Sequence, residues 1–213
     1  MAKRIYIPRI DSIQTLDLQA LDLLLEEKGA KASIDCVNWP KDFPYRPDCN
    51  VTIAHDGTSL ALLYHVRGLD LRAMETQDNG HMWEDSCVEF FVQDPDGSKY
   101  YNFELNCIGR LLAAEGASRE GRQHRDASVL ASIKRFSTVK ETSFQKDGGI
   151  FSWTAGMIIP LSAFGAKGVK ELKVNLYKCA DKTAHVHFVS WSPIDLPNPD
   201  FHRPDFFGDL ILL

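Results

Sequence analysis

The sequence predicts an all-β protein, an antiparallel β-sandwich of the jelly-roll or immunoglobulin-like kind with one N-terminal helix. After residue 30, apolar and polar residues alternate with the period of two that a half-buried strand requires. These segments recur about every ten residues, with Gly, Pro and Asp turn signals between them. Helical periodicity is confined to the N-terminal region. A length of 213 residues suits a single all-β domain, so we expect one domain over residues 1–213, with residues 1–30 as a helical extension.

The predicted helix runs from Thr15 to Lys28. Leu18, Leu21 and Leu25 recur at the three- and four-residue steps that line one helix face. Thr15 is a suitable capping residue, and Gly29 follows the last turn. We expect this helix to lie against a sheet or to cover an open end of a barrel.

The strands follow in order along the remaining chain. The turn signals His55-Asp-Gly-Thr and Asp94-Pro-Asp-Gly-Ser each join two of them, and the proline-rich segment 38–49 is expected to be a loop. The predicted strands are Ala32–Val37, Val51–Ala54, Ser59–Arg67, Met82–Val92, Tyr100–Asn106, Ser132–Lys140, Ile150–Ile159, Leu172–Cys179, His185–Trp191 and Asp209–Leu213.

Charge and hydropathy exclude several classes of partner. The chain carries 24 basic and 29 acidic residues, a net charge of −5. We expect neither nucleic acid nor membrane as a partner, because phosphate attraction and polybasic anchoring both need an excess of positive charge. No apolar run approaches the roughly 20 residues of a spanning helix. Charges and Pro8 stand where a signal peptide would be apolar, which predicts a cytoplasmic protein if Met1 is the native start, and a secreted or periplasmic one if a leader was removed.

The five cysteines cannot all pair within one chain, and none shows C-x-x-C spacing. We therefore expect buried free thiols. Trp39 and Trp153 are expected in the core.

Two neighbouring strands are predicted to place a polar row opposite their apolar one. Val88, Phe90 and Val92 alternate with polar positions, and so do Tyr101, Phe103 and Leu105. With the apolar rows inward, the opposite face carries Asp85, Glu89, Asn102, Glu104 and Asn106; a further row is expected from His185, His187 and Trp191. Such a face supplies the aromatic surfaces and planar polar groups that sugars require. The alternative is an ordinary solvated outer face.

Other interpretations of the same residues stay open. Glu89 and Glu104 suit a glycosidase, whose two carboxyls lie about 5–5.5 or 6.5–9.5 Å apart. His185 and His187 offer half of a metal site, and Asp94–Ser98 matches part of a calcium loop. A third class is a domain whose polar face binds another protein. Walker A, dinucleotide-binding, G-x-S-x-G and H-E-x-x-H motifs are absent, which removes most common enzyme classes.

Three segments stand out together. They are Trp83-Glu-Asp-Ser-Cys-Val-Glu-Phe-Phe-Val, Tyr101-Asn-Phe-Glu-Leu-Asn-Cys-Ile-Gly, and a tail that runs from Trp191-Ser-Pro to Phe207-Gly-Asp-Leu. In this order they resemble family-9 carbohydrate-binding modules and their "family 9-like" relatives in the DOMON-like superfamily. The resemblance begins near Trp39, so the N-terminal helix lies outside the pattern.

The resemblance implies a β-sandwich that binds a mono- or oligosaccharide without cleaving it, in glycan utilisation. It implies no required cofactor and no catalytic residue, but structural calcium. In the sugar-binding members two tryptophans clamp the sugar, and Trp83 and Trp191 are the corresponding candidates. Glu89 and Asn106 are candidate partners of sugar hydroxyls, and Arg122 or Arg125 is a candidate for a charge-assisted contact. The superfamily also contains haem-binding domains, for which Met74, Met82, Met157 and the histidines are available as axial ligands; no haem attachment motif is present.

Overall fold

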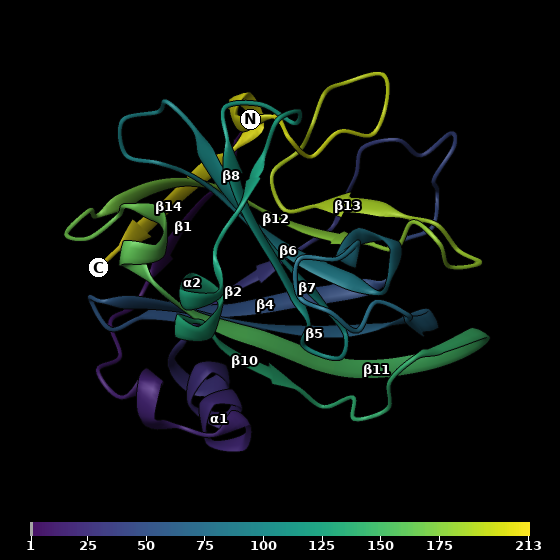
Figure 1. Cartoon of the computed structure of the whole chain (residues 1–213), viewed down its shortest axis with the longest axis horizontal. Helices are drawn as coiled ribbons and strands as arrows, with labels where there is room; N and C mark the ends of the chain where they lie inside the picture. The colour runs from purple at the N-terminus through teal and green to yellow at the C-terminus, as the bar shows by residue number, and fades with distance from the viewer. Residues whose placement is uncertain (1) are drawn as a thin grey trace.

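The computed structural model describes residues 2–213, and its strands form two sheets that stack on each other (Figure 1). Among the described residues, the strands pair antiparallel except β1 with β14, and an isolated bridge between Arg9 and His55 is also parallel. The larger sheet has the order β1 (Arg4–Ile7), β14 (Gly208–Leu212), β12 (Glu171–Cys179), β6 (Cys87–Gln93), β7 (Tyr100–Asn106), β8 (Leu111–Gly116), β9 (Gln123–His124), with β13 (Phe188–Ser190) paired to β12 and β3 (Cys36–Val37) paired to β13. The smaller sheet has the order β10 (Lys134–Ser137), β11 (Phe144–Pro160), β5 (Ser59–Ala73), β4 (Asp48–His55), β2 (Ala30–Ser33).

Short helices connect the strands. They are η1 (Ile13–Thr15), α1 (Leu18–Lys28), η2 (Met82–Glu84), α2 (Ala127–Ser132), η3 (Leu161–Phe164) and η4 (Pro204–Phe206). The predicted all-β sandwich is therefore confirmed. Among the described residues, no helix has the length and apolar character needed to cross a membrane.

The N-terminal helix begins later than its sequence pattern predicts. Asp17, not Thr15, is the cap: its carboxylate accepts a hydrogen bond from the Ala20 amide at 2.9 Å. Thr15 instead ends η1 and donates its hydroxyl to the Ser12 carbonyl. Leu21 and Leu25 pack on the outer face of the smaller sheet, as expected for a helix that lies against a sheet (Figure 1).

Three strands, β1, β8 and β9, and one α-helix, α2, were not predicted. In β8, four consecutive apolar residues, 111–114, are buried on both faces, so the period of two that marks a half-buried strand is absent. Strand β1 lies at the sheet edge and is short. The helix α2 spans only six residues, capped by Asp126, which accepts from the Ser128 and Val129 amides.

The main core lies between the sheets and receives the predicted apolar rows. Val88, Phe90 and Val92 from β6 meet Trp153 of β11 in one cluster. The opposite face of the larger sheet is not an ordinary solvated face, because two long segments cover part of it. Trp39 donates its indole N–H to the Leu196 carbonyl at 2.8 Å, and Phe201 stacks on Tyr177 with ring centroids 4.0 Å apart. The sheet's polar row is thereby enclosed.

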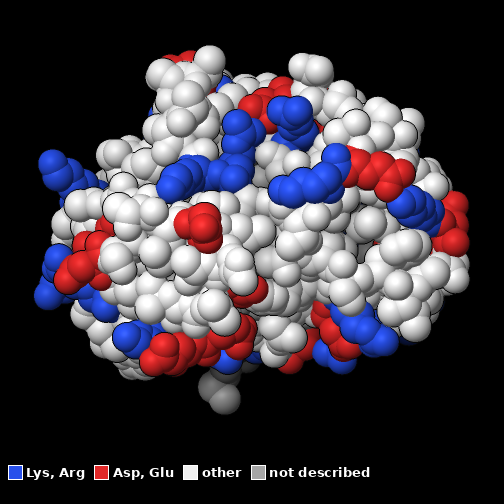
Figure 2. Space-filling view, turned by 90° about the horizontal axis from the view of Figure 1, so that it is seen from below, with Lys and Arg blue, Asp and Glu red and all other residues white. Residues whose placement is uncertain are grey.

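The surface charges are mixed on the face seen from below (Figure 2). Basic side chains gather in a band there, and acidic side chains border it. The net negative charge is therefore not concentrated on this face.

Candidate functional site

A cavity of about 310 Å³ opens on the covered face of the larger sheet. Its floor comes from the middle strands β6, β7, β8 and β12, and its walls come from connecting segments. The lining residues are Trp83, Glu89, Asn102, Glu104, Leu112, Ala114, Arg119, Arg122, His124, Cys179, Asp181, Phe188, Pro199, Asp200, Phe201 and His202.

Strand register explains why the floor is polar. Leu112, Glu104, Glu89 and Tyr177 are directly opposite one another across β8, β7, β6 and β12, so their side chains share one face. The inward face of the same strands is mostly apolar and forms the core, although Lys178 of β12, opposite Val88, is also buried there. The alternation of β6 and β7 therefore places two carboxyls side by side at the bottom of the cavity.

The carboxyl of Glu104 is buried but only half satisfied. Its exposed fraction is 4%, and its Oε1 accepts from the Asn102 side-chain amide at 2.9 Å. Its Oε2 is buried and has no hydrogen-bond partner among the described residues. Burial raises the pKa of Glu104 to about 7, although Asn102 and the charge of Arg122 oppose this rise.

Two further carboxyls share this environment. Burial, and then the nearby charge of Glu84, raises the pKa of Asp181 to about 6, and Asp181 Oδ1 also lacks a partner within the described chain. Burial and the neighbouring Glu104 raise the pKa of Glu89 well above its ordinary value. Its Oε1 accepts from the Cys179 thiol at 2.9 Å. The cavity therefore offers buried oxygens that a ligand with hydroxyl groups can satisfy.

One wall of the cavity is the indole of Trp83, which lies in η2. This side chain is half-buried, and the His81 ring stacks on it at 4.7 Å between centroids. The backbone carbonyl of Trp83 accepts from the Asp181 amide at 3.0 Å, which ties η2 to the segment after β12.

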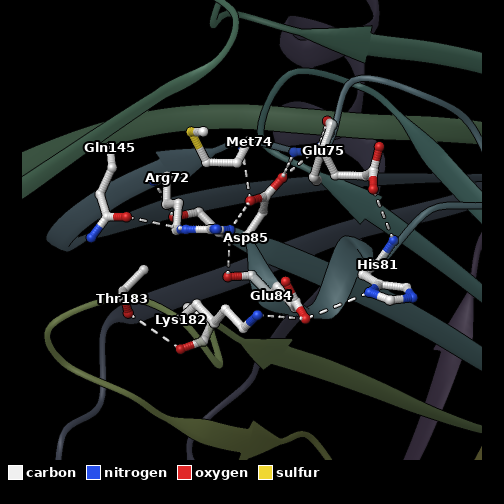
Figure 3. A network of polar contacts seen from close by, with 12 residues as sticks. Arg72, Met74, Glu75, His81, Glu84, Asp85, Gln145, Lys182 and Thr183 are labelled. Carbon is white, nitrogen blue, oxygen red and sulfur yellow. Dashed lines mark hydrogen bonds and ion pairs between the residues drawn. The ribbon is translucent and has the colours of Figure 1, made fainter.

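A buried network fixes η2 in this position (Figure 3). Asp85 Oδ1 accepts from the Arg72 guanidinium and, at 2.9 Å, from the Met74 amide. Its other oxygen accepts from the Glu75 amide at 3.0 Å. Arg72 also donates to the Glu84 carbonyl at 3.1 Å. Asp85, two residues after Trp83, is thus a structural anchor that sets the position of Trp83.

Arg122 lines the cavity, but its donors are already occupied. It donates to Asn102 Oδ1 through Nε at 3.0 Å and Nη2 at 2.6 Å, and to the carbonyls of Tyr100 and Ser118 at 3.0 Å each. Its guanidinium lies 4.1 Å from the centroid of the Tyr100 ring. Arg122 therefore holds the cavity floor and orients Asn102, which in turn donates to Glu104.

Of the six predicted site residues, Trp83, Glu89 and Arg122 come together at the cavity. The predicted clamp is wrong for Trp191, which is 3% exposed and packs in the core between the sheets. Pairing explains the error. Phe188 is opposite Cys179 and lies on the cavity face with it. Because side chains alternate along a strand, Val189 and Trp191 then face the core. The outward polar row that was expected to include Trp191 therefore does not form.

Asn106 and Arg125 also lie elsewhere. Asn106 is fully buried, donates to the Glu75 carbonyl and Asp85 Oδ2, and accepts from the Arg110 amide. These bonds use its polar atoms within the network of Asp85. Arg125 pairs with Glu115 at 2.7 Å, outside the cavity lining.

Several other lining residues were not predicted from the sequence. Asp181 continues the alternation of Tyr177 and Cys179 on β12, and this signal was available. Phe201 and His202 reach the cavity from an irregular segment rich in Pro and Asp, where periodicity carries no information. Their positions depend on long-range packing, such as the Tyr177 hydroxyl donating to the Phe201 carbonyl at 3.0 Å.

The expected metal-binding positions have other partners. His185 Nδ1 lies 2.8 Å from Asp70 Oδ2, and His187 Nε2 lies 2.9 Å from the Lys178 ammonium, so the two rings do not converge. Asp94 accepts from Ser98 and Lys99 within its own turn. Structural calcium stays a prediction.

The β-sandwich and its polar cavity with aromatic walls together are typical of a ligand-binding module. The family model of carbohydrate-binding family 9 matches residues 19–212. The chain therefore belongs to carbohydrate-binding family 9, and the predicted carbohydrate binding is confirmed at the level of the family.

Several solved structures share the fold of this chain. A putative carbohydrate-binding protein from Bacteroides uniformis ATCC 8492 is 40% identical, with 100% of both chains covered and a TM-score of 0.92. A family-9 module from Caldicellulosiruptor kristjanssonii in complex with glucose has a TM-score of 0.63 at 11% identity, covering 99% of this chain and 96% of that one. A family-9 module from the same organism in complex with cellotriose has a TM-score of 0.63 at 12% identity, covering 99% of this chain and 93% of that one. No curated protein matches the sequence.

Proposed function

We propose that the cavity over β6, β7 and β12 binds one end of a mono- or oligosaccharide and does not cleave it. The observation that carries this proposal is the pair of buried, unpartnered oxygens, Glu104 Oε2 and Asp181 Oδ1, in a cavity walled by Trp83. Sugar hydroxyls are donors that satisfy such oxygens, and the indole face suits the apolar side of a sugar ring.

The size of the cavity supports a small ligand. A volume of about 310 Å³ lies at the low end of the range of about 300–1,000 Å³ for small-molecule sites. Phe188 and Phe201 also line it, so aromatic contact does not depend on Trp83 alone. The ligands named for the C. kristjanssonii structures, glucose and cellotriose, are suitable first probes.

The arrangement of the two glutamates favours binding over hydrolysis. Glu89 and Glu104 are directly opposite on adjacent strands, so both project from one floor. A glycosidase instead places its two carboxyls on either side of the scissile bond. A sugar resting on this floor would meet both carboxyls from the same side, which suits hydrogen bonding to neighbouring hydroxyls.

Calorimetry with a panel of neutral mono- and oligosaccharides tests the proposal. We expect micromolar to millimolar affinity, as for a few hydrogen bonds and one stacked ring in an open site. Trp83→Ala and Glu104→Gln should each weaken binding about tenfold or more, a loss of about 1.4 kcal/mol. Glu171→Gln, at an exposed position of β12, is the matched control and should bind as the wild type does. Wild-type affinity in both cavity variants, or heat from none of the sugars, would overturn the proposal; release of a shortened glycan would replace it with the glycosidase interpretation.

A further inference from the structure

Three metal-ligand side chains meet where α1 lies on β5, on the sheet that does not carry the cavity (Figure 1). Asp22 and Glu26 are four residues apart on α1 and so share one helix face. His65 of β5 points at them: its Nε2 is 3.2 Å from Asp22 Oδ1 and 3.8 Å from Glu26 Oε1. All three ligand atoms lie within 4.8 Å of one another.

We propose that Asp22, Glu26 and His65 bind a divalent transition-metal ion, with Zn²⁺ the best fit, and that the ion fastens α1 to the smaller sheet. This site is independent of the proposed saccharide cavity. Zn²⁺ holds imidazole nitrogen and carboxylate oxygen at about 2.0–2.1 Å, which places tetrahedral ligands about 3.4 Å apart. The two distances to His65 bracket this spacing, and water would complete the four ligands.

Two of the three atoms that face one another make no hydrogen bond. Asp22 Oδ1 and His65 Nε2 are both buried and make no hydrogen bond within the described chain, although they are only 3.2 Å apart. Buried polar atoms are normally satisfied, and an unsatisfied one costs free energy. A cation between them would satisfy both at once.

The remaining polar atoms of two ligands are occupied by neighbours. His65 Nδ1 lies 3.3 Å from the Thr154 hydroxyl, and Glu26 Oε2 accepts from Lys31 at 2.6 Å. Such outer contacts orient the ligands of metal sites and leave the opposite atoms free for the ion. With Nδ1–H donating to Thr154, Nε2 presents its lone pair to the cluster.

The donor set selects among ions. One imidazole with two carboxylates suits Zn²⁺ and related transition metals, whereas calcium and magnesium prefer oxygen ligands only. The competing explanation is a simple ion pair between protonated His65 and the two carboxylates. The two explanations predict opposite effects of pH on the stabilisation of this cluster. An ion pair needs imidazolium, whereas a metal needs neutral imidazole.

The test uses the whole chain, stripped of metal with a chelator, and titrated with Zn²⁺ by calorimetry and by thermal unfolding. We expect one ion per chain and a Tm that rises with Zn²⁺. The rise should be larger at alkaline than at acidic pH, because a metal ion binds only neutral imidazole. Co²⁺ should give the absorption of a tetrahedral nitrogen and oxygen site.

Variants assign the ion to these residues. Asp22→Asn and His65→Gln, each first checked for a native circular dichroism spectrum without metal, should weaken Zn²⁺ binding more than about tenfold. Glu27→Gln, exposed on the same helix and outside the cluster, is the matched control and should bind normally. Cys179→Ser disrupts a second cluster of potential metal ligands among the described residues, Cys87, Glu89 and Cys179. Loss of binding only in Cys179→Ser, equal binding in all variants, or no response to Zn²⁺ would each overturn the proposal.

Discussion

Glu89 of β6 and Glu104 of β7 lie directly opposite each other in the larger sheet, and both are buried beneath the cavity. Two carboxyls this close cannot both ionise without repulsion and loss of hydration. Burial holds the pKa of Glu104 at about 7, and burial together with Glu104 raises that of Glu89. Near neutral pH the floor therefore contains protonated carboxyl, which donates as well as accepts hydrogen bonds.

This pair predicts a pH dependence of stability. In the unfolded chain, Glu104 titrates near the ordinary value of about 4.3–4.5, whereas in the folded protein its pKa is about 7. Between these values the unfolded state binds fewer protons, so the free energy of unfolding falls as pH rises through this window, by up to ~3 kcal/mol. Below about pH 4.3 the contribution is fully present, and above about pH 7 the loss is complete.

Urea unfolding across this pH range measures the effect. The difference between wild type and Glu104→Gln should change by most of that amount, because the amide does not titrate. Glu171→Gln, exposed at the start of β12, should follow the wild type in parallel. Parallel curves for wild type and Glu104→Gln would contradict the assignment of Glu104 as the titrating group.

Substitutions of the two tryptophans of the expected clamp should have different effects, one mainly on the free energy of unfolding and the other mainly on saccharide affinity. Trp191→Ala empties a site in the main core and should cost about 3–5 kcal/mol of unfolding free energy. It should leave saccharide affinity unchanged once the protein is folded. Trp83→Ala should do the reverse, with a smaller cost in stability and a clear loss of affinity, because Trp83 is half-buried at the cavity wall.

Chemical unfolding and calorimetry at low temperature measure both quantities on the same samples. Trp191→Phe, which preserves most of the packing, covers the case in which the alanine variant does not fold. A loss of saccharide affinity in folded Trp191→Phe, with none in Trp83→Ala, would show that the roles are exchanged.

Local alternation made part of the site predictable. The apolar and polar faces of β6 and β7 follow from their sequences, since each strand is long enough for a period of two to be read. That is why Glu89 was placed correctly, on one face with Glu104. The same alternation extended past β12 leads to Asp181 at the cavity.

The features of the site that local patterns do not predict depend on contacts between distant segments. The outer face is covered because Trp39 and Phe201 pack over it, and no local pattern shows which loop covers which sheet. Trp191 follows a strand of only three residues, whose facing is set by pairing with β12 rather than by a visible period. Asn106 shares a face with Glu89, but the network of Asp85 uses its amide.

That network predicts a link between a buried charge and ligand affinity. Asp85→Asn replaces two acceptor oxygens with one and leaves Arg72 without its carboxylate partner (Figure 3). Breaking a buried ion pair in this way should cost about 3–5 kcal/mol. Because η2 is held by this network, Trp83 should become less ordered and saccharide affinity should fall.

Asp205→Asn, which loses an exposed pair with Arg203, is the control, with a cost within about 1 kcal/mol. Full affinity in folded Asp85→Asn would separate the network from the site.

Arg122 and Arg125 are both partly buried, and they allow a comparison of an arginine that makes many hydrogen bonds with one that makes a single ion pair. Arg122→Lys loses the planar fork that donates to Asn102 and to several carbonyls while stacking on Tyr100, so we expect a destabilisation of about 2–4 kcal/mol. Arg125→Lys keeps a charge beside Glu115 and should change stability by less than about 1 kcal/mol.

The same pair tests how Arg122 acts in binding. Its donors are used by the protein, so its effect on a saccharide should pass through the orientation of Asn102 and Glu104. Asn102→Asp retains the acceptor for Arg122 but removes the donor to Glu104, and should therefore weaken binding even where Arg122 is intact. If Arg122→Lys weakens binding while Asn102→Asp does not, Arg122 contacts the ligand directly, and its charge-assisted role would replace the positioning role argued from these hydrogen bonds.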